Sequence, residues 1–413
     1  MRCTSCTIIL LSSLVLFARC EKNSFLVSLK PKESLDSFML YDASYPEELQ
    51  VKDSITKSFK IGSFAGFTGE FTDQVLERLS RCPLVDEISP DIIVYSLDTH
   101  YQMFAPRHLA RLSRRKRMLP IRKYPFIYNN EFAGKKVNAY VIDSGIYIGH
   151  PEFQGRARTG RDFSNEGEGD NNGHGTHVAG LIGAKTYGVA KHVEIFDVKA
   201  LNAVGTGTLS TIIAAIEFVV NHRLRSGRPG VANLSFGAHH NAILNSAVEQ
   251  ATRTGLVFVV AAGNSNIDAC LMSPASSPYA ITVGAIDDHG DSISGFSNWG
   301  RCVDIFASGS NVRSVDFKNI YKSSILSGTS MASPIVAGVV ATLLSEGVDP
   351  ACVKDRLKEI ATVNRISRTS MYFRPDTSNK IAYVEVEEEF SKADIDSQSD
   401  PDELESYANP ISP

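Results

Sequence analysis

From residue 137 onward, short apolar runs alternate with longer segments of helical apolar spacing, and this alternation constrains the fold more than any other feature. The runs are apolar at nearly every position, as in strands of a parallel sheet that helices cover on both faces. The sequence therefore predicts an α/β fold with a doubly wound, mainly parallel sheet. The predicted strands are 137–142, 193–198, 231–234, 256–260, 280–283 and 303–306, and the predicted helices are 209–220, 242–253 and 331–344.

Polar residues that can take part in catalysis lie at the ends of these elements. Asp143, in the string VIDSG, follows an apolar run and is expected at the carboxyl end of a strand, where open α/β sheets gather their sites. His174, in GHGTH, follows a polar loop and opens a helical segment. Ser330, in GTSMASP, also opens a helical segment. All three side chains are therefore expected where rigid backbone meets solvent.

These residue types together can cleave an acyl bond. A serine hydroxyl is a weak nucleophile and needs an adjacent base, which a carboxylate in turn orients. Asn264, in AAGN, follows the strand 256–260 and offers an amide N–H for the oxyanion, and the backbone N–H of Ser330 offers another. Taken singly, an Asp after a strand and a His before a helix are ordinary turn and capping residues. Their joint occurrence favours a catalytic triad.

The four strings closely resemble the subtilisin-like serine peptidases (subtilases), in particular the proteinase K branch and its fungal vacuolar cerevisin-type relatives. The order Asp, His, Ser along the chain is that of subtilisins. The resemblance extends over about residues 22–385. It implies that Asp143 orients the imidazole, His174 acts as general base and then acid, Ser330 is the nucleophile and Asn264 binds the oxyanion. It also implies a structural role for His177.

The resemblance further implies an extended peptide substrate, held by strand-like pairing. The residues expected to bind it are Gly205, Thr206, Gly207, Ser235, Phe236, Gly237, Ala262 and Gly263. The chain departs from the branch at Ile335 and Ala238, which leaves open a catalytically weak or inactive peptidase-like binding protein. An α/β-hydrolase esterase is disfavoured, because Ser330 lacks the G-x-S-x-G string and the acid precedes the histidine.

Two structural features follow from the same resemblance. Related enzymes of the aqualysin kind imply a disulfide between Cys270 and Cys302, which closes a loop of about 30 residues and contributes about 3 kcal/mol. Related enzymes also hold structural calcium, here through the carbonyls of Pro278 and Ala280 and the carboxylate of Asp304. One carboxylate is a low charge for calcium, so a hydrogen bond alone is the alternative for Asp304. No cofactor is expected for the chemistry.

The N-terminal third predicts a secreted precursor. Residues 1–20 have the positive start, short apolar stretch and small-residue end of a signal peptide, and no apolar run is long enough to span a membrane. Residues 21–99 show the order βαββαβ of a ferredoxin-like α+β domain. This domain resembles the inhibitor-type propeptide of the family, which implies a zymogen whose own propeptide inhibits it. The expected destination is the vacuole or the cell exterior, including the cell wall.

The remaining residues are divided between the peptidase domain, 100–385, and an acidic tail, 386–413, expected to be disordered. The tetrabasic string RRKR at 114–117 is either a processing site or part of the mature surface. We expect propeptide cleavage between about residues 97 and 102, with this string inside the mature enzyme.

The net charge of −4 argues against general nucleic-acid binding. We expect polypeptide substrates and a monomer.

Overall fold

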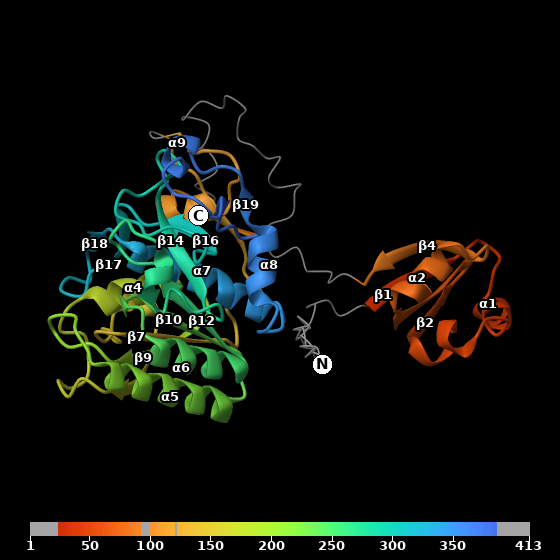
Figure 1. The fold of residues 1–413 in the computed structure, drawn as a ribbon, viewed down its shortest axis with the longest axis horizontal. Helices are drawn as coiled ribbons and strands as arrows, with labels where there is room; N and C mark the ends of the chain where they lie inside the picture. The colour runs from red at the N-terminus through yellow and green to blue at the C-terminus, as the bar shows by residue number, and fades with distance from the viewer. Residues whose placement is uncertain (1–23, 92–98, 120–121, 386–413) are drawn as a thin grey trace, which may run out of the picture. The chain divides into compact units, whose positions relative to one another are not determined.

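The computed structural model describes residues 24–91, 99–119 and 122–385 (Figure 1). The expected signal peptide and acidic tail lie outside these residues. Contacts divide the chain into two units, residues 1–96 and 97–413. Within the described residues, no helix has the length and apolar character needed to cross a membrane.

The first unit is the predicted α+β domain. Its strands are β1 (Ser24–Leu29), β2 (Ile55–Ile61), β3 (Phe64–Glu70) and β4 (Val85–Pro90), and its helices are α1 (Leu35–Asp42) and α2 (Asp73–Ser80). The strands form an antiparallel sheet in the order β2-β3-β1-β4. Side chains of Ser34 and Thr72 cap the two helices, and Phe38 packs on Phe67 with ring centroids 4.9 Å apart. The predicted order of elements is confirmed.

The second unit is built on a ten-stranded sheet in which nine strands run in the order β19-β20-β16-β14-β12-β10-β7-β9-β8. All neighbours in this order are parallel except β19 and β20. The central strands are β7 (Asn138–Asp143), β10 (Gly230–Leu234), β12 (Leu256–Ala261) and β14 (Ile281–Asp287), with β9 (Glu194–Lys199), β8 (Ala157–Asp162), β16 (Ile305–Ser308), β20 (Lys380–Ile381) and β19 (Thr362–Val363) outside them.

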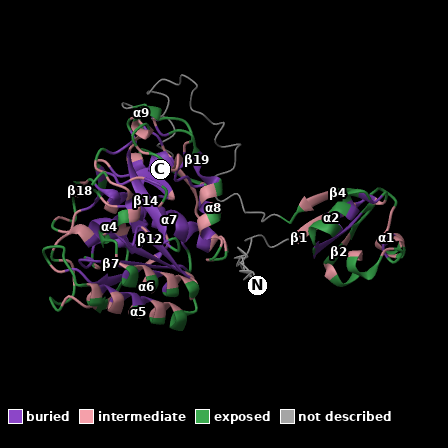
Figure 2. Ribbon diagram, in the orientation of Figure 1, coloured by how far each residue is buried: buried purple, intermediate pink, exposed green. Residues whose placement is uncertain are grey.

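Helices cover both faces of this sheet (Figures 1 and 2). One face packs on α4 (His174–Gly183) and α7 (Thr329–Ser345), and the other packs on α5 (Leu209–Ser226) and α6 (Ala242–Arg253). Alternate residues of β7 serve the two faces, since Val141 lies in the first core and Ile142 in the second. The doubly wound, mainly parallel α/β fold is therefore confirmed.

Several details differ from the prediction. Strand β14 continues to Asp287 instead of ending at 283, β16 is Ile305–Ser308 instead of 303–306, and helix α8 (Val353–Ile360) was not predicted. Helix α5 continues six residues beyond 220 because polar residues extend it to Gly227, which caps the helix at φ 64°. Strand β8, with the sequence ARTGRD, was not predicted. It lies at the edge of the sheet, where half-exposed polar residues replace the apolar pattern of a central strand.

Candidate active site

Three neighbouring parallel strands bring the candidate residues to one edge of the sheet. Strands β7 and β10 pair with Ile142 opposite Leu234, and β10 pairs with β12 with Leu234 opposite Val260. The carboxyl ends of these strands therefore lie side by side. Asp143 ends β7, Ser235 follows β10, and Asn264 lies three residues after β12.

Asp143 is buried and holds the imidazole of His174. Its Oδ1 lies 2.8 Å from Nδ1 of His174, the side chain of Asp143 is 0% exposed and that of His174 27%. Burial lowers the pKa of His174, but the charge and hydrogen bond of Asp143, with the charge of Asp170, outweigh it and raise the pKa above its ordinary value. The pair can orient the ring and stabilise its protonated form.

Asp170, which the sequence analysis missed, organises the loop before His174. Its Oδ1 accepts hydrogen bonds from the hydroxyl of Ser144 and the backbone N–H groups of Asn172 and Gly173. Its Oδ2 accepts from the N–H and hydroxyl of Thr176. Through these five bonds Asp170 links Ser144, which follows β7, to the loop before α4 and to the first turn of that helix. The available signal was an acidic residue four positions before the histidine in a Gly/Asn loop.

The nucleophile candidate opens α7, which packs against the sheet beside α4. The Ser330 hydroxyl donates to the carbonyl of Ser235 at 2.9 Å, and the Ser235 hydroxyl donates to the carbonyl of Ser330 at 2.9 Å. Among the described residues, the Ser330 hydroxyl has no hydrogen bond to His174. A second link joins Ser333 to Asn233 of β10 at 2.7 Å, so the first turn of α7 is fixed on this strand.

Asn264 is oriented by the residue that precedes the serine. Its Oδ1 accepts from the N–H of Thr329 at 2.8 Å and from the Thr329 hydroxyl at 2.9 Å. The same hydroxyl accepts from the N–H of Gly263 at 3.1 Å. Because the amide oxygen is engaged, the amide N–H groups of Asn264 remain as donors for a ligand. Ser330 lies in the first turn of α7, where backbone N–H groups lack helical partners.

Another missed residue, Asn172, joins the expected substrate loop to the histidine. Its Nδ2 donates to the carbonyl of Ala203 at 2.9 Å, and its Oδ1 accepts from the N–H of His174 at 3.2 Å. The loop of Gly205, Thr206 and Gly207 is exposed, and Gly205 has φ 79°, which favours glycine. On the other side, Ser235 is buried, Phe236 half-buried and Gly237 exposed.

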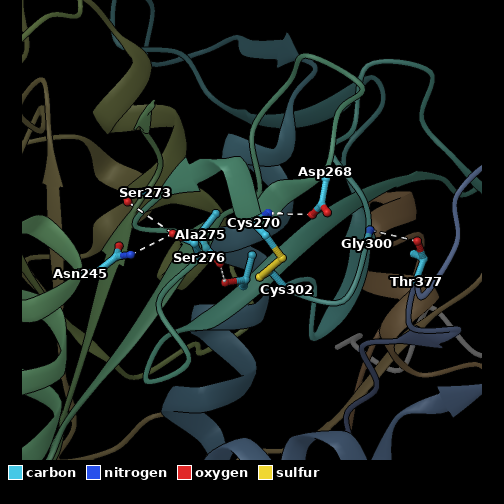
Figure 3. The surroundings of a disulfide bond; sticks show 10 residues. Asn245, Asp268, Cys270, Ser273, Ala275, Ser276, Gly300, Cys302 and Thr377 are labelled. Carbon is cyan, nitrogen blue, oxygen red and sulfur yellow. Dashed lines mark hydrogen bonds between the residues drawn. A yellow bond between two sulfur atoms is a disulfide. The ribbon is translucent and has the colours of Figure 1, made fainter. Parts of the chain in front are cut away.

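The implied disulfide is present in the structure. Cys270 and Cys302 are bonded, and the backbone N–H of Cys270 donates to Asp268 (Figure 3). The disulfide joins the segment after Asn264 to the segment before β16, so it restricts the movement of the segment that follows Asn264.

The buried His177 lies one helical turn beyond His174. Burial, followed by the charge of His174, lowers the pKa of His177 to about 3, so its ring is neutral.

The residues implied for calcium lie together but contact lysine. The carbonyls of Pro278 and Ala280 and the carboxylate of Asp304 all bond Nζ of Lys354, on helix α8 (Val353–Ile360). The sequence analysis did not single out this lysine.

Comparisons with known proteins agree with this architecture. The model of the subtilase family matches residues 134–380, more than half of the chain. The chain belongs to the subtilase family. A second model, that of the peptidase inhibitor I9 family, matches residues 24–96 of this subtilase. The implied inhibitor-type domain is thereby confirmed.

Individual relatives are also subtilases. The chain is 42% identical to the subtilase-type proteinase RRT12 of Saccharomyces cerevisiae over 375 residues, covering 81% of this chain and 76% of the relative. It is 41% identical to cerevisin of the same yeast over 300 residues, covering 70% of this chain and 47% of cerevisin. The crystal structure of a cold-adapted subtilisin-like serine proteinase superposes with a TM-score of 0.63 at 42% identity, covering 69% of this chain and 100% of that one. The expected serine endopeptidase class is confirmed.

Proposed function

We propose that this subtilase hydrolyses peptide bonds through Asp143, His174 and Ser330, with Asn264 as oxyanion donor. The observation that carries the proposal is the buried carboxylate of Asp143 bonded at 2.8 Å to Nδ1 of His174. This bond leaves Nε2 of His174 to take a proton. The serine that opens α7 and the oriented amide of Asn264 supply the other two groups.

In the proposed reaction, the Ser330 hydroxyl leaves the carbonyl of Ser235 by rotation about its side-chain bond. Its oxygen attacks the substrate carbonyl carbon while Nε2 of His174 takes the proton. Nδ2 of Asn264 and the backbone N–H of Ser330 bind the oxyanion. The protonated imidazole then donates to the leaving amine, and an acyl-enzyme remains. Water attacks this ester by the same route, and Ser330 recovers its proton.

We propose that the inhibitor-type domain is the chain's own propeptide. Cleavage between about residues 97 and 102 would leave the peptidase domain with the tetrabasic string. The contacts of this string support retention: Arg114 lies over the ring of Tyr124, Arg115 over Tyr383, and Arg117 donates to the carbonyl of His289. Upstream of it, the buried Arg111 pairs with Asp291 at 2.9 Å. We further propose entry into the secretory pathway, with delivery to the vacuole or cell exterior.

Expression of the full chain tests the catalytic proposal and the propeptide proposal. Wild type is expected to release a mature enzyme that begins between about residues 97 and 102 and cleaves peptides. Ser330→Ala and His174→Ala are expected to accumulate the uncleaved precursor, while the neighbouring Ser327→Ala is expected to mature. A mature chain that starts after Arg117 contradicts the cleavage proposal. Normal peptide turnover by Ser330→Ala contradicts the catalytic one, and a wild type without turnover favours the binding-protein alternative.

A further inference from the structure

An ammonium group of the chain itself bonds all three oxygens that the family resemblance implies for calcium. Nζ of Lys354 lies 2.7 Å from the carbonyl oxygen of Ala280, 3.0 Å from that of Pro278 and 2.9 Å from Oδ2 of Asp304. A lysine ammonium has three N–H donors. The three oxygens therefore use its full donor capacity, and the ammonium nitrogen occupies the point at which they converge.

These residues do not fit a calcium ion. Calcium takes six to eight oxygen ligands at about 2.3–2.6 Å, and its affinity rises with the number of carboxylates. Here the shared centre of the oxygens is a nitrogen atom, and Asp304 is the single carboxylate among them. Its other oxygen, Oδ1, lies 2.7 Å from Nζ of Lys358. Two positively charged lysines thus contact one carboxylate. The three groups together carry a net positive charge, which repels a divalent cation.

The position of the ammonium is set by a packed helix. Lys354 and Lys358 are four residues apart in α8, so they project from the same face. Val353 and Leu357 are buried against the core and anchor the helix. The side chains of Lys354 and Asp304 are 27% and 11% exposed, in contrast to a loose surface pair. Ala280 and Asp304 directly precede β14 and β16, so the ammonium joins two strand starts to α8.

We propose that Lys354 is an internal replacement for a metal ion, which makes this part of the subtilase independent of calcium. The ammonium is bound by two backbone carbonyls and a carboxylate. It therefore takes the place of a monovalent cation, and helix α8 holds it in position. The proposal does not depend on the catalytic assignment, since its readout is unfolding.

Thermal unfolding of the mature enzyme, blocked by a serine-peptidase inhibitor, tests the exclusion of calcium. Melting is measured in chelator and in millimolar calcium for wild type and for Asp304→Asn. Any change in melting temperature between chelator and calcium is expected to be the same in the two proteins, because calcium does not bind at Asp304. A calcium-dependent rise in the melting temperature of wild type that Asp304→Asn abolishes overturns the proposal.

Matched lysine variants test the role of the ammonium. Lys354→Met leaves two carbonyls and a carboxylate without their shared donor and is expected to lower the melting temperature by about 4 °C or more. Lys358→Met removes a neighbouring charge from the same carboxylate but no carbonyl contact, and is expected to lower it by less than half as much. Equal losses for the two variants, or no loss for Lys354→Met, overturn the proposal.

Discussion

Thr329 orients the amide of Asn264: its backbone N–H and its hydroxyl both donate to Oδ1 of Asn264, at 2.8 and 2.9 Å. The residue next to the nucleophile therefore points the donor that is proposed to bind the oxyanion. The two bonds from Thr329 therefore fix the position of Asn264 relative to Ser330, although 66 positions separate these residues in the sequence.

Asn264→Leu is expected to lower kcat by about 10²–10³-fold with little change in KM, the size measured for an oxyanion donor of a subtilisin. Thr329→Val keeps the backbone bond but loses the hydroxyl bond to Asn264, and is expected to lower kcat by about 10-fold. Thr329→Ser retains the hydroxyl and serves as the control. Steady-state kinetics on a peptide substrate measure all three. A Thr329→Val enzyme with wild-type kcat would show that Asn264 needs no such orientation.

The acid limb of the pH profile should report His174. Catalysis needs the neutral imidazole, so kcat/KM falls as the pH drops through the pKa of His174. Burial lowers this pKa, but Asp143 and then Asp170 raise it above the ordinary value. Asp143→Asn should therefore move the acid limb to lower pH, and should lower kcat by about 10⁴-fold. An acid limb that stays in place in this variant contradicts the assignment of the limb to His174.

Asp170→Asn tests the loop that carries the histidine. An asparagine keeps one acceptor oxygen, whereas Asp170 accepts five hydrogen bonds through two. We expect a loss of about 1–3 kcal/mol in unfolding free energy. We also expect an acid limb at lower pH, because a negative charge near His174 is removed. Glu168→Gln, an exposed change in the same loop, is the control and should leave the limb in place.

The disulfide should stabilise the peptidase unit. Its cysteines are 32 positions apart, and on the loop-entropy model their replacement by serine lowers the unfolding free energy by about 3–4 kcal/mol. Calorimetry of wild type and of the Cys270→Ser, Cys302→Ser double variant measures this. Reductant should lower the melting temperature of wild type by more than that of the double variant, which already lacks this bond. Identical melting of the two proteins without reductant would contradict a stabilising role.

The sequence predicted those features that depend on local pattern. The central strands, the helices α4, α5, α6 and α7, and the strings around Asp143, His174, Asn264 and Ser330 were readable because apolar runs and small residues mark them. Contacts between distant segments were not. Lys354 lies 50 positions after Asp304, and neither apolar periodicity nor a motif indicates that its ammonium reaches that carboxylate. The edge strand β8 was hidden because an exposed strand lacks the apolar run on which the prediction depends.

The most direct measurement is active-site labelling of the mature wild-type enzyme with a fluorophosphonate, followed by peptide mapping. Our account predicts one phosphonyl group per chain, attached to Oγ of Ser330, with loss of peptidase activity in proportion to labelling. The label should be absent from His174→Ala. Labelling of a different residue with loss of activity, or full activity in a chain labelled at Ser330, would contradict it.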